Sequence, residues 1–253
     1  QYSGDAKTVT PTPWDALGQA FLDYLNGDKT ATVRFHSEYW EVDEVAVSIF
    51  FRDSGPPRPL EDRAVELCRG RILDAGAGAG IHALALQRLG FKVCAIDVSP
   101  LAVEVMIDRG IQEAHCADIF HFDPIQPFDT LLLLMNGIGI VESLEGLQRF
   151  FERAHSLLRP DGQILLDSSD PRTQLEANER PPWESKSKTG VYWGETQFQI
   201  EYKGQMGEPF GWLFVDSETL AQHARQTGWT CQVLRWDKDS RYLARMIRAK
   251  RRT

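Results

Sequence analysis

The sequence has few cysteines, few histidines and no long hydrophobic run. Its 253 residues include 4 cysteines and 6 histidines. The cysteines are dispersed, without a CxxC pair or a histidine at metal-ligand spacing, which predicts free thiols in a reducing compartment and no metal site. No run approaches the roughly 18 apolar residues that a membrane-spanning helix needs, and the first residues show no signal-peptide pattern. We therefore expect a cytoplasmic protein without a membrane partner.

Positive charges are outnumbered by negative ones. The chain carries 28 lysines and arginines against 36 acidic residues, a formal net charge of -8. Nucleic-acid binding usually needs a broad basic surface, so the composition disfavours a nucleic-acid partner and leaves a small molecule as the expected one. The basic ending at residues 248–252 is expected to be a solvated tail.

From residue 71 onward, short apolar segments alternate with amphipathic ones. The pattern predicts helices and strands in turn, with strands at 71–74, 92–97, 114–117, 128–135 and 163–167, and helices at 81–89, 100–109 and 144–158. Ser99 is expected to cap the second of these helices, with Pro100 at its first position. Strands that alternate with helices imply an α/β fold with a doubly wound, mostly parallel sheet.

Two regions interrupt this alternation and suggest four segments. Residues 1–59 are expected to form an N-terminal helical or lid segment, with a helix at 13–25, and residues 60–170 the core of the alternating fold. Residues 171–215 begin with a proline-containing polar stretch and continue with a strand-like alternation, which predicts an inserted β cap. Residues 216–253 would complete the core.

A glycine-rich loop, Leu73-Asp74-Ala75-Gly76-Ala77-Gly78-Ala79-Gly80, lies between the first strand and the first helix of the core. Gly76, Gly78 and Gly80 let the backbone turn tightly and approach a ligand closely. Asp97 ends the next strand, about twenty residues later, where an acid can bind both ribose hydroxyls. Enzymes that use NAD share this feature, so the loop and Asp97 leave the cofactor open.

The order of the later segments distinguishes between the cofactors. Ile81 stands where the dinucleotide fingerprint GxGxxG has its last glycine, and further segments follow at 93–100, 116–119, 128–139 and 157–169. Residues 70–169 resemble the class I, Rossmann-like S-adenosylmethionine-dependent methyltransferases in this spacing. The resemblance implies S-adenosyl-L-methionine as cofactor, S-adenosyl-L-homocysteine as product, and a seven-stranded sheet. Residues 229–236 and 242–248 would supply its final pair.

The resemblance also implies a role for each part of the cofactor site. Asp74, Gly76 and Gly78 would shape the methionine pocket, and Asp97 would hold the ribose. Val98 would pack on the adenine, and the adenine edge would be bound by Ala117, Asp118 and Ile119. Asn136 and Gly137 would lie beside the methionine amino group and the donor methyl. Each acid has a simpler alternative: Asp74 as a brace for the loop, Asp97 as a structural acid and Asp118 as the cap of a turn.

The acceptor side lacks a comparable motif, because methyl transfer requires alignment more than a dedicated catalytic group. The candidates for substrate binding are Tyr39, Arg52, Tyr192, Trp193 and Tyr202, and the candidates for catalysis are Asn136, His82 and Tyr192. Trp40, Phe50 and Trp212 lie in the same two regions. The alternatives are packing of the cap for the aromatic residues, a surface ion pair for Arg52 and a hydrogen bond at the helix start for His82.

These observations favour methyl transfer to a small molecule. Met135-Asn136-Gly137-Ile138 replaces the Asn/Asp-Pro-Pro-Tyr motif of enzymes that methylate DNA bases or protein glutamine. Three alternatives remain open at this point. They are an enzyme that cyclises or cleaves S-adenosylmethionine, as azetidine-2-carboxylate synthases do, a NAD-dependent oxidoreductase, and a binder without activity.

Overall fold

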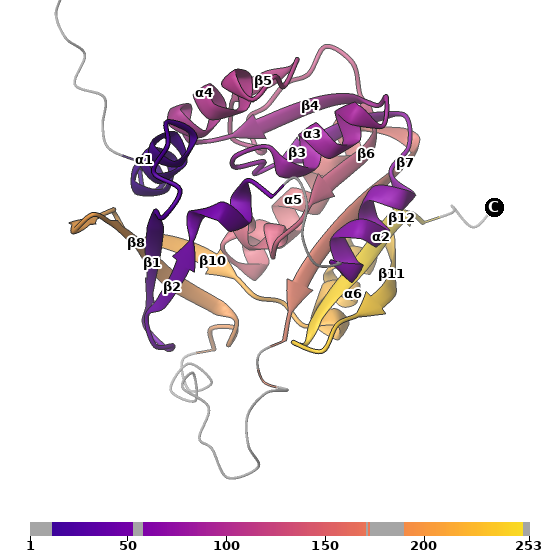
Figure 1. Ribbon diagram of the computed structural model, residues 1–253. Helices are drawn as coiled ribbons and strands as arrows, with labels where there is room; N and C mark the ends of the chain where they lie inside the picture. Colours follow the sequence, from indigo (N-terminus) through magenta and orange to yellow (C-terminus); the bar gives the residue numbers. More distant parts are fainter. Residues whose placement is uncertain (1–11, 53–57, 171, 173–189, 250–253) are drawn as a thin grey trace, which may run out of the picture.

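A computed structural model describes residues 12–52, 58–170, 172 and 190–249. Its strands form two sheets, a seven-stranded sheet in the order β11-β12-β7-β6-β3-β4-β5 and a smaller sheet in the order β10-β8-β1-β2, with β9 paired to β8 (Figure 1). The seven-stranded sheet belongs to the predicted α/β core, and the smaller one, hereafter the cap sheet, lies beside it. Each helix in the described part of the chain is too short or too polar to cross a membrane.

The core sheet confirms the predicted doubly wound, mostly parallel fold. Its strands are β3 (Arg71–Ala75), β4 (Lys92–Asp97), β5 (Ala114–Cys116), β6 (Phe128–Leu133), β7 (Leu158–Ser169), β11 (Trp229–Trp236) and β12 (Arg241–Arg248). The first five run parallel to one another, whereas β12 is antiparallel to both β7 and β11. Leu131 and Leu132 in β6 are fully buried, as expected for a strand covered on both faces.

Strand β7 begins earlier than its apolar pattern indicates. Residues 159–162, Arg-Pro-Asp-Gly, have the composition of a turn between the predicted helix and the predicted strand at 163–167, but they lie inside β7, between the pairs Phe128–Leu158 and Thr130–Gln163. The extra residues on the β7 side form a bulge, so pairing with β6 begins before the turn sequence and resumes after it. Local turn propensity alone does not reveal that the chain on both sides pairs with the same strand.

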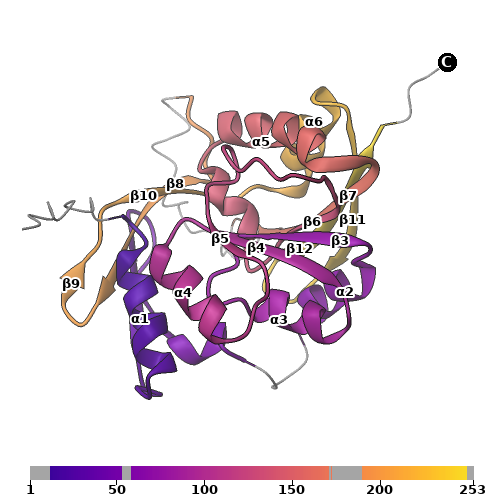
Figure 2. The ribbon, with the colours of Figure 1, turned by 90° about the horizontal axis from the view of Figure 1, so that it is seen from above.

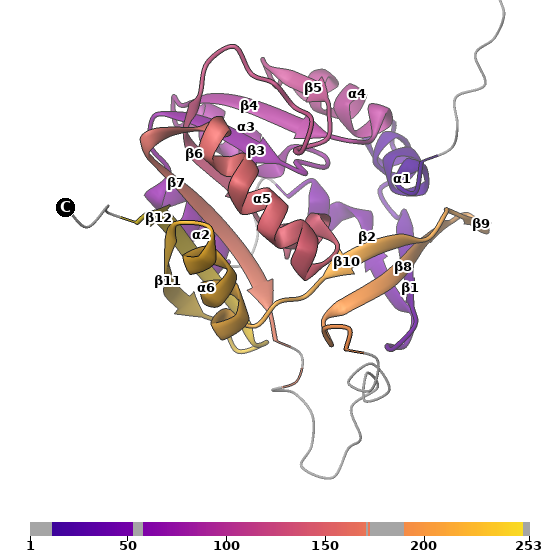
Figure 3. The same ribbon diagram turned by 180° about the vertical axis from the view of Figure 1, so that it is seen from behind.

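Helices cover both faces of the core sheet. The apolar sides of α5 (Leu144–Leu157) and α6 (Ser217–Gln226) pack on one face, and those of α2 (Pro59–Leu67), α3 (Ile81–Arg88) and α4 (Pro100–Asp108) pack on the other (Figures 2 and 3). The Ser99 Oγ accepts a 3.2 Å hydrogen bond from the Ala102 N–H, which confirms the expected cap of α4. This arrangement leaves the carboxyl ends of the parallel strands for a ligand.

The cap sheet combines two regions that are far apart in the sequence. Its strands are β1 (Thr32–Ser37), β2 (Asp43–Ala46), β8 (Glu195–Tyr202), β9 (Gln205–Met206) and β10 (Phe210–Leu213), and a short 3-10 helix, η1 (Val47–Phe50), follows β2. The N-terminal segment, expected to be helical, thus contributes two strands to the sheet of the expected inserted cap. Side chains join the two regions as well, since His36 lies 2.7 Å from Glu201.

Helix α1 (Asp15–Leu25) fastens the cap sheet to the core. Phe21 belongs to a buried apolar cluster that also contains Val33 and Ile200 from the cap sheet and Val105 from α4. Gly18 approaches α4 so closely that a Cβ at this position would lie 2.5 Å from the Ser99 Oγ. The cap is therefore held next to the ends of β3 and β4, where the glycine loop begins.

Candidate cofactor and acceptor site

A cavity of about 680 Å³ lies at the carboxyl ends of the parallel strands. The glycine loop and the ends of β4, β5 and β6 line one side, while α1, η1 and the cap sheet line the other. In open α/β sheets, ligands bind at this edge. We call the side of the glycine loop the cofactor end and the side of α1, η1 and the cap sheet the acceptor end.

The glycine loop has the backbone that its sequence predicts. Gly76, Gly78 and Gly80 have φ angles of 69°, 56° and 78°, in the left-handed region that glycine adopts without strain. Gly76 and Gly78 line the cavity. Gly80 lies behind them at the start of α3, where a Cβ would lie 2.2 Å from the Ile111 Cδ1. Gly80 therefore forms a turn that packs against Ile111, and it is not among the residues that line the cavity.

Asp97 connects the loop to the end of β4. Its Oδ2 accepts a hydrogen bond from the Gly78 N–H, and its Oδ1 accepts one from the Ser99 N–H, both at 2.9 Å. A carboxylate oxygen can accept more than one hydrogen bond, and Asp97 also lines the cavity, so both oxygens can still accept from a ribose diol. Burial raises the pKa of Asp97, while the backbone N–H groups of Ser99 and Gly78 oppose this shift.

The next wall of the cofactor end has the character expected for an adenine site. Val98 lines the cavity and is 41% exposed, so its apolar surface is available for a flat ring. Ala117, Asp118 and Ile119 line the cavity beside it. The Asp118 Oδ1 accepts a 3.0 Å hydrogen bond from the Phe120 N–H, so this residue also caps a turn. The two interpretations of Asp118 are thus compatible.

Asp74 occupies a different position from the other loop residues. It is 2% exposed and is not among the cavity-lining residues of the described chain. Its Oδ2 has no hydrogen-bond partner among the described residues, and burial raises its pKa to about 6. This geometry favours the brace interpretation, in which Asp74 supports the loop from behind.

His82 lines the cavity but already has a partner. Its Nε2 lies 3.0 Å from the Glu61 Oε2, and both residues are buried. Burial acts to raise the pKa of Glu61, but the hydrogen bond with His82 and the charges of His82, Arg58 and Arg52 lower it to about 2. The contact matches the hydrogen-bonding alternative for His82 at the start of α3.

The end of β6 is strained where the two ends of the cavity meet. Met135 and Asn136 have φ angles of 63° and 57°, which non-glycine residues rarely adopt and which gather at ligand sites. Asn136 lines the cavity, and its buried Oδ1 has no hydrogen-bond partner among the described residues. The Asp167 Oδ1 accepts a 3.3 Å hydrogen bond from the Gly137 N–H. A ligand amino group would satisfy the Asn136 oxygen, and this fits the methionine part of S-adenosylmethionine.

The acceptor end is aromatic. Ten lining residues of the whole cavity are aromatic, and most come from α1 and the cap sheet. The Trp40 ring centroid lies 5.3 Å from that of Phe214 and 6.2 Å from that of Phe198. Trp212 packs against Gly139, where a Cβ would lie 2.1 Å from the indole ring. The carboxylates at this end belong to Glu41, Asp43 and Glu142.

The five predicted substrate residues lie elsewhere in the described chain, outside the lining of this cavity. The Tyr192 hydroxyl donates to the Asp216 Oδ2 at 2.6 Å, and the Tyr202 hydroxyl donates to the Asp23 Oδ2 at 2.9 Å. Arg172 lies 4.4 Å from the Trp193 ring centroid. Tyr39 precedes the lining residue Trp40, and its ring packs edge-on against it. These assignments remain predictions, and other aromatic residues line the cavity in their place.

Sequence reasoning missed Phe198, Phe214, Asp43 and Glu142. Phe198 carried a usable signal, because it alternates with Thr196 and Ile200 on one face of β8. That pattern identifies a face of the strand, but only the tertiary structure places this face over the glycine loop.

Arg52 lines a second cavity of about 680 Å³, which shares Ile49, Met135 and Asn136 with the first. Its cationic side chains are those of Arg52, Arg58, Arg235, Lys238 and Arg241, and its acids are Glu61, Asp237 and Asp239. The Arg52 Nε is buried and has no hydrogen-bond partner among the described residues. An Arg52 Nη nitrogen lies 3.7 Å from the Glu61 Oε1, which matches the ion-pair alternative for this residue. Burial and the charge of Arg58 lower the pKa of Arg52, while the charge of Glu61 opposes this shift.

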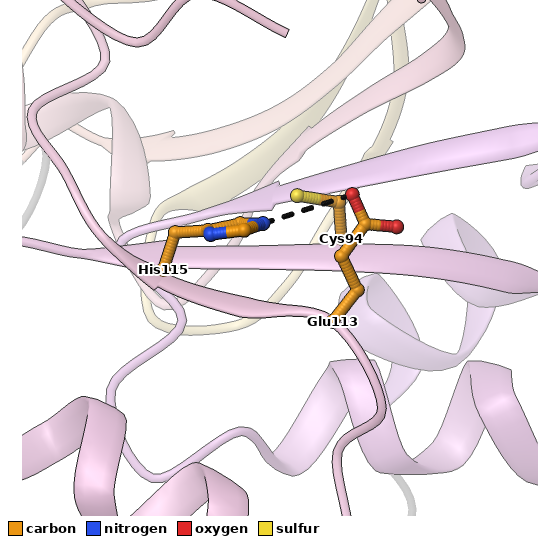
Figure 4. A group of neighbouring side chains, drawn as sticks. All are labelled: Cys94, Glu113 and His115. Atoms are coloured by element: carbon orange, nitrogen blue, oxygen red, sulfur yellow. Dashed lines mark ion pairs between the residues drawn. The ribbon is translucent and has the colours of Figure 1, made fainter. Parts of the chain in front are cut away.

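Strand pairing also brings together Cys94, Glu113 and His115, whose potential ligand atoms lie within 4.8 Å of one another (Figure 4). Their spacing in the sequence does not suggest a cluster, but β4 and β5 are parallel neighbours. Glu113 already forms a 2.7 Å ion pair with Arg71, and burial, with the nearby Glu113, raises the pKa of the Cys94 thiol to about 12. In this cluster at the edge of the sheet, Glu113 is therefore already held by Arg71.

Comparison with known proteins agrees with this geometry. A family model described as a methyltransferase domain matches residues 51–233. A SAM-dependent methyltransferase from Bacteroides fragilis, whose crystal structure contains S-adenosyl-L-homocysteine, has 40% sequence identity with this chain. The two structures match with a TM-score of 0.84 over 96% of this chain and 98% of that one. The CcbJ methyltransferase from Streptomyces caelestis shares the fold at 15% identity, with a TM-score of 0.61 over 80% and 96% of the two chains.

Curated relatives match a shorter region. A ubiquinone biosynthesis O-methyltransferase from Methylocella silvestris is 42% identical over 157 residues, which are 60% of this chain and 56% of that protein. Another, from Xanthomonas euvesicatoria, is 28% identical over 131 residues, or 45% and 53% of the two chains. The chain thus spans about half the length of these curated relatives. The family model and the full-length structural match carry the assignment: the chain belongs to the class I S-adenosylmethionine-dependent methyltransferases.

Proposed function

We propose that this protein transfers the methyl group of S-adenosylmethionine to a small-molecule acceptor and releases S-adenosylhomocysteine. One observation carries the proposal. A single cavity runs from Gly76, Gly78 and Asp97 to the aromatic residues of the cap sheet, and Asn136 lies where its two ends meet. Donor and acceptor can therefore lie in contact within one site.

The residues of the cofactor end would bind S-adenosylmethionine in parts. Asp97 would accept hydrogen bonds from the ribose, Val98 would pack on the adenine, and the Asn136 oxygen would accept a hydrogen bond from the amino group. When bound, the cofactor supplies a methyl group already activated by a positively charged sulfur. The protein then has to align the two reactants and exclude water, which accounts for several kcal/mol of rate enhancement.

The acceptor is proposed to be a small molecule because α1 and the cap sheet line its side of the cavity. The net charge of -8 works against a polyanion such as nucleic acid. All four cysteines, Cys68, Cys94, Cys116 and Cys231, are free thiols. Their state supports our proposal of a reducing, cytoplasmic location.

The first test is equilibrium binding followed by turnover. We expect S-adenosylhomocysteine to bind and to raise the melting temperature, and NAD to do neither. Incubation with S-adenosylmethionine and a panel of acceptors should then release S-adenosylhomocysteine only when an acceptor is present. Release of methylthioadenosine without an acceptor would contradict methyl transfer and indicate cleavage or cyclisation of the cofactor.

A further inference from the structure

The ionisable side chains around the cavity are almost all acidic. In the described lining, five side chains are carboxylates, one is a histidine, and lysine and arginine are absent. Asp97 and Asp118 lie at the cofactor end and hold backbone N–H groups there. Glu41, Asp43 and Glu142 remain, and all three are exposed residues at the acceptor end.

The position of Glu142 is built into the fold. Its φ of 68° is a left-handed angle that a non-glycine residue rarely adopts. Gly211 of β10 faces it so closely that a Cβ there would lie 2.8 Å from the Glu142 Cβ. Glu142 also directly follows the short helix η2 (Gly137–Val141), which begins after Asn136. Its carboxylate is therefore attached to the segment that leaves the proposed transfer point.

Aromatic rings supply the second feature of the acceptor end. The Trp40, Phe198 and Phe214 rings form a contiguous group with centroid separations of 5.3 to 6.2 Å. Aromatic faces attract cations, and the attraction grows where water is displaced. Rings combined with carboxylates favour an organic cation with an apolar body over a neutral or anionic ligand.

The opposite charge gathers on the other side of Asn136. The second cavity has five cationic side chains against three acids and shares Met135 and Asn136 with the first. Arg52 and Arg58 are paired with Glu61, and Arg241 is paired with Asp167, so the excess of positive charge is small. Charge thus changes sign across the proposed transfer point. An anionic acceptor would be repelled at the aromatic end and attracted to the second cavity, whereas a cationic acceptor would be attracted to the aromatic end.

From these observations we infer that the acceptor is an amine with an apolar body, and that this protein is an N-methyltransferase; the inference rests on the proposed function. The amine enters as an ammonium ion and releases one proton to a carboxylate of the acceptor end or to water. Its nitrogen lone pair then forms a bond to the methyl carbon while the carbon–sulfur bond breaks and its electron pair stays on sulfur. The products are the methylated ammonium ion and neutral thioether S-adenosylhomocysteine.

Three probes with the same phenyl body test the end group: 2-phenylethylamine, 2-phenylethanol and 3-phenylpropanoate. Each is titrated by calorimetry into the protein saturated with S-adenosylhomocysteine, and each is then incubated with S-adenosylmethionine. We expect the amine to bind at least about tenfold more tightly than the other two and to be the probe that is methylated. A cationic probe at a partly desolvated aromatic and acidic site gains about this much.

Charge-neutral variants locate the effect. Glu142→Gln and the double variant Glu41→Gln/Asp43→Asn should each weaken amine binding about three- to tenfold and leave S-adenosylhomocysteine affinity within twofold. Glu208→Gln is the matched control, because this exposed acid lies between β9 and β10, outside the cavity lining. It should leave both affinities unchanged.

The outcomes separate this inference from the proposed function. If the alcohol or the acid binds as tightly as the amine, or if the amine does not bind at millimolar concentration, the acceptor is not an amine of this kind. Equal amine affinity in all variants would also overturn the inference. In each case, retained binding of S-adenosylhomocysteine leaves the proposed function intact, whereas loss of that binding in the unmodified protein would refute the proposed function itself.

Discussion

Replacement of Asp97 by alanine is the most direct test of the cofactor site. In the structure, each carboxylate oxygen accepts one backbone N–H, from Gly78 or from Ser99, and the residue lines the cavity. The substitution would remove the charged acceptor of two hydrogen bonds donated by the ribose hydroxyls, each worth about 1.5–3 kcal/mol. Solvent in an open cavity reduces this gain, so we expect S-adenosylhomocysteine affinity to fall about 10- to 100-fold.

The assay is isothermal calorimetry with S-adenosylhomocysteine and with its 2′-deoxy analogue. If Asp97 binds the ribose, the deoxy analogue should bind the unmodified protein more weakly, and this difference should disappear in the variant. Asp108→Ala is the control, since Asp108 is an exposed acid at the end of α4. Unchanged affinity in a folded Asp97→Ala variant would remove Asp97 from the binding site.

Three further predictions concern charge and packing around the site. Asp74→Asn should raise the stability of the protein at pH 8 by about 1–3 kcal/mol and have little effect at pH 4, as measured by urea unfolding. The reason is that burial raises the pKa of Asp74 to about 6, so the buried carboxylate lowers the stability of the folded state as pH rises from about 4 through 6. An equal effect of the substitution at both pH values would contradict this prediction. Arg52→Gln should lower the affinity for S-adenosylhomocysteine several-fold but not the affinity for methylthioadenosine, which lacks the carboxylate. The reason is that the Arg52 Nε is buried without a hydrogen-bond partner among the described residues. Equal losses of affinity for the two ligands would assign Arg52 a structural role. Gly139→Ala should raise the KM for the acceptor and leave cofactor affinity unchanged, because a Cβ at this position would lie 2.1 Å from the Trp212 ring. Unchanged acceptor kinetics would show that this ring does not shape the acceptor end.

The cofactor end could be predicted from sequence because its signals are local. The glycine loop follows one strand directly and Asp97 ends the next, so the alternation of strands and helices is enough to bring them to one edge of the sheet. The structure places Gly76, Gly78, Asp97, Val98 and Asn136 around one cavity. The sequence also contains the period-2 pattern of β8, which separates its two faces.

The acceptor end was decided by tertiary structure. β1 pairs with β8 across most of the chain, as the contact between His36 and Glu201, 165 residues apart, illustrates. The alternation of apolar and polar residues identifies the two faces of a strand. It does not identify the strand that pairs with it or the residues that its inner face covers, because these depend on long-range packing. For the same reason, Tyr202 hydrogen-bonds to α1, whereas Phe198, on the same face of the same strand, lines the cavity. Local chain geometry thus determined the cofactor end of the cavity, and the pairing of distant strands determined the charge and shape of its acceptor end.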